Sequence, residues 1–228
     1  MKPVLLKKSG AFQAEGPNSS ELSDRDALIG DYYSAEEIMA LKGRKVSVFG
    51  GGGILHGSHY YEKARVFAQN IATAGISVMT GGGTGIMEAA NRGVHESKSN
   101  VATSYGIRVK EITYENKNLF VHTEYEFNTL ALRLVTLISI SDVIICFPGG
   151  FGTLEETFST LVRMRVGLLK KMPVYLFGEG FWRGLTEWME NTLLKEEVID
   201  QPDLQLFTVF DDVDTLSEQV ISYIKSLE

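Results

Sequence analysis

A glycine-rich run in the middle of the chain, residues 148–156, contains one threonine and ends in two glutamates. Glycines let the backbone come close to an anion, and the N–H groups at the start of a following helix favour a phosphate there. Glu156, one helical turn after the threonine, would then place a carboxylate close to that phosphate. The candidate phosphate-binding residues are Gly149, Gly150, Gly152 and Thr153, the last through its hydroxyl as well.

Two further glycine clusters, 50–53 and 81–85, follow short apolar runs, but no cluster matches a standard nucleotide fingerprint. The dinucleotide pattern needs a glycine in its sixth place, where the chain has Leu55 or Ile86. The P-loop needs Gly-Lys followed by Ser or Thr, which follows none of the clusters. Any single loop could equally be a tight strand-to-helix turn. Together the loops favour a phosphate ligand and disfavour an NAD-dependent oxidoreductase or an ATPase.

The composition limits the classes of partner. The chain has 228 residues with 22 basic and 29 acidic side chains, a net charge of −7. Non-specific binding of nucleic acid needs a basic face, so we expect no nucleic-acid partner. No stretch approaches the roughly 20 apolar residues of a membrane span. The N-terminus also lacks the apolar core of a signal peptide. We therefore expect a cytoplasmic protein with no membrane partner.

The cysteine and the histidines offer few candidates for a reactive thiol or a metal site. Cys146, the single cysteine, lies in an apolar run and is expected to be buried rather than reactive. His56 and His59 could share a helix face, but no further Cys or His is placed to complete a zinc site. The sequence therefore predicts no metal.

Beyond residue 43, short apolar runs alternate with helical patterns, which predicts βαβ units around a parallel sheet. Right-handed crossovers place helices on both faces, so the predicted fold class is α/β, a Rossmann-like doubly wound sheet. The predicted strands are 45–49, 76–80, 101–107, 142–147, 173–177 and 206–210. The predicted helices are 60–74, 86–96, 129–140, 153–166, 181–194 and 213–224. The glycine clusters then lie at the carboxyl ends of strands, where such sheets bind ligands.

The chain divides into two predicted parts. Residues 1–43 form an N-terminal arm, polar to about residue 33 and followed by a short helix that a capping box opens at Ser34. Residues 44–228 form one Rossmann-like nucleotide-binding domain, without a linker or an internal repeat.

Two motifs resemble the signatures of the Lonely guy family, once labelled possible lysine decarboxylase. Residues 148–156 are similar to its P-G-G-x-G-T-x-x-E signature, and residues 81–93 look like its first signature in bacterial members. The resemblance begins at about Arg44. It implies hydrolysis of a nucleoside 5′-monophosphate, such as AMP or a cytokinin riboside monophosphate, to free base and ribose 5-phosphate. It also implies a homodimer or larger homo-oligomer, with sites near the subunit interface and no organic cofactor.

The resemblance also implies roles for individual residues. Glu156 would stabilise an oxocarbenium-like state and activate water. Arg133, nine residues before Asp142, matches the family's arginine and would orient the nucleotide or stabilise the departing base. From the first motif, Gly82, Gly83 and Glu88 are expected to contact the substrate, Glu88 at a ribose hydroxyl.

Each of these roles has an alternative. Thr153 and Glu156 also fit a capping box, Arg133 could be an ordinary helix arginine, and Glu88 could serve packing only. The chain also departs from the family, with Leu134 in place of the lysine after the arginine and Val162 in place of a threonine. A non-catalytic carrier of a nucleotide or of the molybdenum cofactor, on the same fold, is therefore the alternative function.

Overall fold

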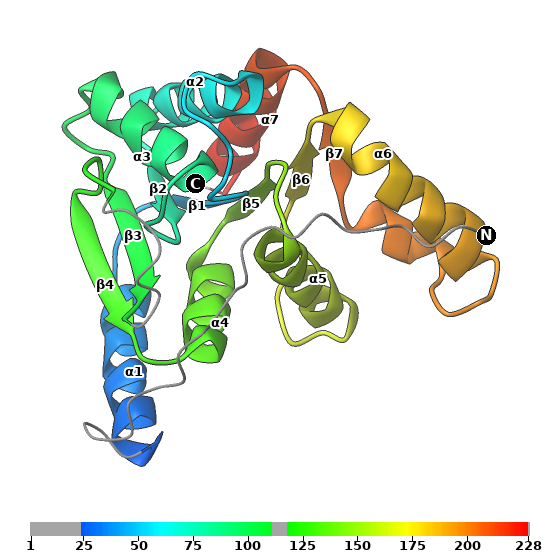
Figure 1. The fold of residues 1–228 in the computed structure, drawn as a ribbon, viewed down its shortest axis with the longest axis horizontal. Helices are drawn as coiled ribbons and strands as arrows, with labels where there is room; N and C mark the ends of the chain where they lie inside the picture. The colour runs from blue at the N-terminus through cyan, green and yellow to red at the C-terminus, as the bar shows by residue number, and fades with distance from the viewer. Residues whose placement is uncertain (1–23, 111–117, 228) are drawn as a thin grey trace, which may run out of the picture.

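The computed structural model describes residues 24–110 and 118–227 (Figure 1). Seven strands form one sheet in the order β4-β3-β2-β1-β5-β6-β7, and every neighbouring pair is parallel. The strands are β1 (Lys45–Phe49), β2 (Ser77–Thr80), β3 (Ser104–Val109), β4 (Thr123–Phe127), β5 (Val143–Cys146), β6 (Val174–Phe177) and β7 (Thr208–Phe210). The helices are α1 (Asp24–Met39), α2 (His59–Thr73), α3 (Ile86–Ser97), α4 (Leu130–Ile140), α5 (Phe151–Arg165), α6 (Glu179–Trp188) and α7 (Val213–Lys225). A π-helical turn, Met189–Leu194, continues α6, and a 3-10 turn, Gln201–Gln205, precedes β7.

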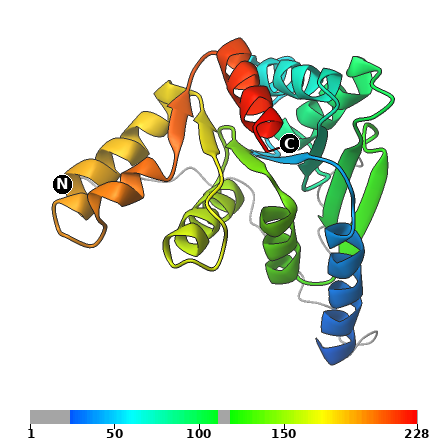
Figure 2. The same cartoon turned by 180° about the vertical axis from the view of Figure 1, so that it is seen from behind.

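Helices cover both faces of the sheet, which confirms the predicted doubly wound α/β fold. The α2, α3 and α7 helices lie on one face, and α4, α5 and α6 lie on the other, with α1 beside α4 (Figures 1 and 2). Every residue of β1, β2, β5 and β6 is buried, as expected for central parallel strands with helices on either side. Two apolar cores result, one on each face. No helix in the described part of the chain is long and apolar enough to cross a membrane.

The structure corrects two sequence predictions at the edge of the sheet. The strand β4 was not predicted: it is a short edge strand within a polar connection, and its residues alternate between exposed and half-buried up to the buried Phe127. The helix α1 begins at Asp24, ten residues before the predicted capping box. Ser34 therefore lies inside a helix, where its hydroxyl donates to the carbonyl oxygen of Glu126 at 3.3 Å. The rest of the predicted arm, residues 1–23, lies outside the described residues, and the division at residue 43 stays a prediction.

A buried aspartate fastens α1 to the start of α4. Asp31 is fully buried, and its carboxylate accepts hydrogen bonds from the N–H groups of Asn128 and Thr129 at 2.6 and 2.8 Å. It also accepts from the amide of Asn128 at 2.9 Å and from the hydroxyl of Thr129 at 2.6 Å. These donors include N–H groups at the N-terminus of α4 that have no acceptor within that helix. A side chain from α1 thus caps the helix that carries Arg133.

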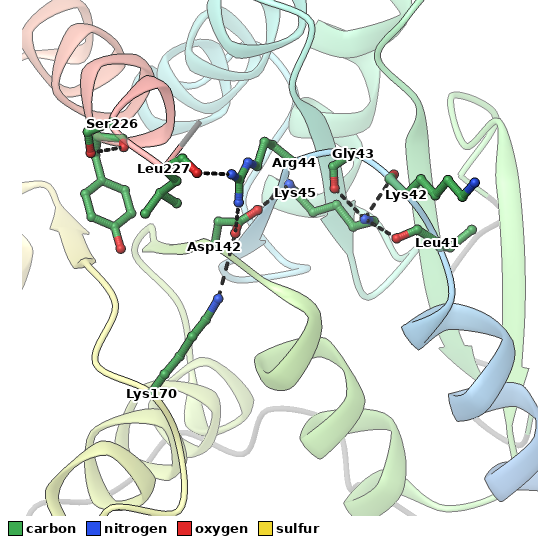
Figure 3. Close-up of polar contacts among 10 residues, drawn as sticks. Leu41, Lys42, Gly43, Arg44, Lys45, Asp142, Lys170, Ser226 and Leu227 are labelled. Atoms are coloured by element: carbon green, nitrogen blue, oxygen red, sulfur yellow. Dashed lines mark hydrogen bonds and ion pairs between the residues drawn. The ribbon is translucent and has the colours of Figure 1, made fainter.

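A second polar cluster ties the chain together at the amino ends of β1 and β5 (Figure 3). Asp142 accepts a hydrogen bond from the backbone N–H of Lys45 at 3.0 Å and pairs with the guanidinium of Arg44 at 3.3 Å. Arg44 also donates to the carbonyl oxygen of Leu227 at 2.6 Å, which holds the end of the chain against the sheet. This cluster lies at the sheet edge opposite the glycine loops. It therefore stabilises the fold away from the candidate site.

Candidate functional site

A cavity opens at the carboxyl ends of the central strands. The chain order reverses between β1 and β5, because β2, β3 and β4 follow on one side of β1 and β6 and β7 on the other. Doubly wound sheets bind ligands at such a switch point. The cavity has a volume of about 440 Å³, within the range of small-molecule sites. Its lining residues are Gly50, Gly51, Gly52, Gly53, Gly81, Met87, Arg108, Val109, Leu130, Arg133, Leu134, Gly150, Gly152, Thr153, Glu155 and Glu156.

An ion pair between α4 and α5 lies in this cavity. Arg133 donates from its terminal nitrogen to the carboxylate of Glu156 at 3.1 Å, and from its Nε to the carbonyl oxygen of Ile107 at 2.9 Å. The two side chains are only 11% and 12% exposed. A Cβ on Gly81 would lie 2.0 Å from the guanidinium, so the arginine occupies space that any other residue there would fill. The structure thus brings Arg133 and Glu156 together, with the arginine held by three elements.

The start of α5 faces the same cavity, but the helix begins earlier than predicted. Gly150 is the N-cap residue and Phe151 the first helical residue, so Thr153 lies inside the first turn. The capping-box alternative for Thr153 and Glu156 is therefore wrong, and Glu156 is directed to Arg133 instead. A Cβ on Gly150 or Gly152 would meet nothing within 4 Å. Gly150, Gly152 and Thr153 line the cavity, so the start of α5 borders it, and the unpaired N–H groups of a helix start favour an anion.

Gly149 has a different part in the site. A Cβ there would lie 2.1 Å from the hydroxyl oxygen of Thr153 and 2.7 Å from the backbone nitrogen of Gly51. That same nitrogen donates to the carbonyl oxygen of Pro148 at 2.9 Å. Gly149 therefore lets the loops after β1 and β5 pack directly against each other, and it does not line the cavity.

The other predicted residues of the first motif lie outside the cavity lining. Gly82 has a φ of +72°, a conformation that favours glycine. The carbonyl oxygen of Gly83 accepts a hydrogen bond from Asn118 at 3.0 Å. Glu88 accepts a hydrogen bond from the hydroxyl of Tyr61 at 2.9 Å, which supports the packing alternative for this residue. From the cluster 81–85, the cavity lining includes Gly81 instead.

Sequence reasoning missed several lining residues. Arg108 belongs to β3, directly after the strand predicted at 101–107, so its place at a carboxyl strand end was a usable signal. Glu155 also lines the cavity, although it is exposed. Leu134 borders the cavity while it is 5% exposed and packed in the core, so the family's lysine is replaced by a residue of the cavity wall.

Cys146 is buried, as predicted, at the end of β5. Burial raises the pKa of its thiol to about 12, and the hydroxyl of Thr157 donates to its sulfur at 3.2 Å. The thiolate is therefore scarce at neutral pH, which suits a packing role. In residues 24–110 and 118–227, no three His, Cys, Asp or Glu side chains gather in a way that could hold a metal ion.

Comparisons with known proteins identify the family of the chain and its relatives. The model of a family described as "Possible lysine decarboxylase" matches residues 87–220, more than half of the chain. Cytokinin riboside 5′-monophosphate phosphoribohydrolase LOG5 of Arabidopsis thaliana is 26% identical over 161 residues, which cover 69% of this chain and 68% of that protein. LOG3 of the same plant is 26% identical over 162 residues, covering 69% and 73%.

Solved structures share the fold at lower identity. The molybdenum cofactor binding protein of Rippkaea orientalis superposes with a TM-score of 0.60 at 22% identity, over 81% of this chain and 99% of that one. The molybdenum cofactor carrier protein of Chlamydomonas reinhardtii gives a TM-score of 0.58 at 22% identity, with the same coverage. At this identity, the likeness concerns the fold.

Proposed function

Because the chain belongs to the Lonely guy family, whose model is described as "Possible lysine decarboxylase", we propose that it is a phosphoribohydrolase. Its substrate would be a nucleoside 5′-monophosphate, such as AMP or a cytokinin riboside monophosphate. The N-glycosidic bond is cleaved by water to give the free base and ribose 5-phosphate. The curated relatives that carry this activity in their names are about one quarter identical, so the proposal depends equally on the chemistry of the cavity.

One observation carries the proposal: a carboxylate held by an arginine lies in the same cavity as the open N-terminus of α5. The 5′-phosphate is bound by the N–H groups at 151–153 and by the hydroxyl of Thr153. The ribose then extends toward Glu156, one turn further along α5. Arg133 fixes the direction of that carboxylate, because its own Nε is anchored to the carbonyl oxygen of Ile107.

The reaction needs one water and no other reactant. As the bond between C1′ and the base nitrogen breaks, positive charge develops on the ribose, and the carboxylate of Glu156 stabilises it. Glu156 accepts a proton from the water whose oxygen adds to C1′. The departing base gains one proton at the nitrogen that was bonded to the ribose, and this balances the proton that Glu156 accepts from the water and then releases. One water is thereby added across the glycosidic bond.

A carrier of a nucleotide or of the molybdenum cofactor is the second candidate. Leu134 favours it, because the wall beside Arg133 is apolar where the family signature has a basic residue. The Arg133–Glu156 pair favours the hydrolase, since a carrier has no need for a carboxylate held at the centre of its cavity. The two candidates differ in one measurable property, the release of ribose 5-phosphate.

The test is an incubation of the purified protein with a panel of nucleoside monophosphates, followed by measurement of ribose 5-phosphate. Glu156→Gln is expected to lower the rate by about 10²- to 10⁴-fold, because it removes the general base but keeps the shape. Glu218→Gln is the control, since it changes an exposed carboxylate on α7, outside the cavity lining. Binding of nucleotide without release by the wild type would support the carrier instead.

A homodimer or larger homo-oligomer is part of the proposal, with a second copy of the chain against the outer face of α5. That face and the loop after it expose large apolar side chains, which are rarely clustered on a monomer's surface. Its exposed residues are Phe151 (93%), Val162 (55%), Val166 (58%) and Leu168 (76%). Glu155 borders both this face and the cavity, so a second subunit would lie close to the substrate.

Light scattering after size exclusion tests the oligomer. Val162→Arg is expected to give a monomer, because it places a charge in the centre of the apolar face. Val198→Arg is the control, since Val198 is similarly exposed, at 57%, and lies outside this face. A wild-type protein that is monomeric at the concentration of the activity assay would contradict the dimer.

A further inference from the structure

The cavity contains a second arginine, and its donors are free to meet a ligand. Arg108 lies near the end of β3, is partly buried and lines the cavity. Among the described residues its side chain forms no ion pair and donates no hydrogen bond, whereas Arg133 already uses two of its side-chain nitrogens. Its stem lies over Gly82, where a Cβ would be 2.8 Å from Cγ and 3.3 Å from Cδ of Arg108. The absence of a side chain at Gly82 thus makes room for this arginine.

The position of Arg108 assigns it to the far end of the ligand. Strands β3 and β5 are three places apart in the sheet, which corresponds to about 14 Å at about 4.8 Å for each step. If the phosphate binds at α5, the ribose lies near Glu156 and the base extends toward β3. Met87, Val109, Leu130 and Leu134 line this cavity too and supply apolar walls for a flat ring. Arg108 then supplies a charged group with free donors at the β3 end of the cavity.

The chemistry of a guanidinium restricts which base fits. Arginine has five N–H donors and no acceptor. Guanine and hypoxanthine present two adjacent acceptors, N7 and O6, which a guanidinium can contact with two parallel hydrogen bonds. Adenine presents N7 beside an amino group, so one donor of the arginine would face another donor. A donor left unpaired in a closed site lowers affinity.

We propose that Arg108 shifts the preference of this protein away from the adenine nucleotides that the family resemblance implies and toward purine nucleotides with an oxo group at C6, such as GMP or IMP. The inference rests on the proposed function for the orientation of the nucleotide. A contact of this kind corresponds to about 10- to 100-fold discrimination between bases.

Two measurements test it, with GMP, IMP and AMP as probes. The first is kcat/KM for release of ribose 5-phosphate. The second is calorimetric binding to the Glu156→Gln protein, which reports base preference even if no substrate is cleaved. Both are repeated with Arg108→Met, which keeps the stem over Gly82 and removes the donors. Arg183→Met is the control, because Arg183 lies on α6 and pairs with Glu179 outside the cavity.

The wild type is expected to prefer GMP and IMP. Arg108→Met is expected to abolish this preference by lowering the affinity and kcat/KM for GMP and IMP while leaving those for AMP unchanged. The inference would be overturned if AMP had an equal or higher kcat/KM than GMP and IMP in the wild type, or bound equally well or more tightly. An equal loss for all three nucleotides in Arg108→Met would also overturn it, because it would mean that the arginine contacts the phosphate or ribose. If binding shows the base preference but no ribose 5-phosphate is released, the hydrolase proposal fails and the role of Arg108 stands.

Discussion

Gly149, in the loop before α5, and Gly152, in the first turn of α5, are expected to respond differently when a methyl group is added. In Gly149→Ala, the new Cβ would lie 2.1 Å from the hydroxyl oxygen of Thr153 and 2.7 Å from the backbone nitrogen of Gly51. Rotation of the hydroxyl would not relieve the contact, because the Cβ of Thr153 also lies 2.7 Å away and the Gly51 nitrogen is backbone, hydrogen-bonded to Pro148. The loops after β1 and β5 must therefore separate by about 1 Å to restore normal contact distances.

The loss of stability in Gly149→Ala can be estimated from the cost of overpacking. A forced shift of this kind costs about 1–3 kcal/mol. For a domain of this size, about 2–4 °C of melting temperature correspond to each kcal/mol, so Gly149→Ala should melt roughly 2–12 °C below the wild type. Gly152→Ala should melt at or slightly above the wild-type temperature, because its Cβ meets nothing within 4 Å and alanine is the better helix residue.

The assay measures melting with and without a ligand. Inorganic phosphate should raise the melting temperature of the wild type by stabilising the folded state. Gly152→Ala should lose most of this protection, because its methyl group enters the space at the start of α5. The reasoning would be refuted if Gly149→Ala melted like the wild type, or if Gly152→Ala were protected by phosphate as well as the wild type is.

Three further predictions concern the frame around the site. Asp31→Ala should lower the free energy of unfolding in urea by roughly 3 kcal/mol, because it removes the acceptor of four hydrogen bonds from residues 128–129; Asp31→Asn should cost less. Gly93→Ala should destabilise the packing of α3 on α2 by about 1–3 kcal/mol in the same assay, since its Cβ would lie 2.1 Å from the carbonyl oxygen of Arg65. Cys146, whose thiol has a pKa of about 12, should resist a thiol reagent at pH 8 in the native protein and react at once in guanidinium. The reactivity of the native protein should rise as the pH increases toward 12, because more of the thiol is then ionised. Rapid labelling of the native protein at pH 8 would contradict its burial.

The central part of the fold could be predicted because its signals are local. The strands β1, β2, β5 and β6 are short apolar runs that end in glycine or proline, and all their residues are buried. The edge strand β4 was missed because its alternation of polar and apolar residues, a weak strand signal over only five residues, lies within a polar connection. The start of α1 was not predicted from the sequence for a related reason. Its apolar residues include several that remain exposed, such as Leu28, Tyr32 and Tyr33, so the helix carries no clean buried stripe.

The sequence motifs predicted individual residues of the candidate site but not the contacts between them. Glu156 and Arg133 were identified singly, but their contact depends on how α4 and α5 approach each other. The start of α4 is in turn held by Asp31, which lies far away in the sequence and carries no motif. Gly82 and Glu88 belong to a motif, yet they are absent from the cavity lining, because a motif can encode backbone geometry and helix packing as well as ligand contacts.

The structure explains why the chain has Leu134 where the family signature has a lysine. Its side chain is 5% exposed in the core behind the cavity, so a lysine there would have to carry its charge out of an apolar layer. The basic residue of the family signature is therefore replaced by part of the wall, while Arg108 brings a second positive charge to the cavity from β3. Of the two arginines in the lining, Arg133 is already committed to Glu156 and to a backbone carbonyl. In the proposed enzyme, the group that positions the catalytic carboxylate and the group that chooses the base thus reside on separate elements, so that a change at Arg108 can alter specificity without disturbing the carboxylate.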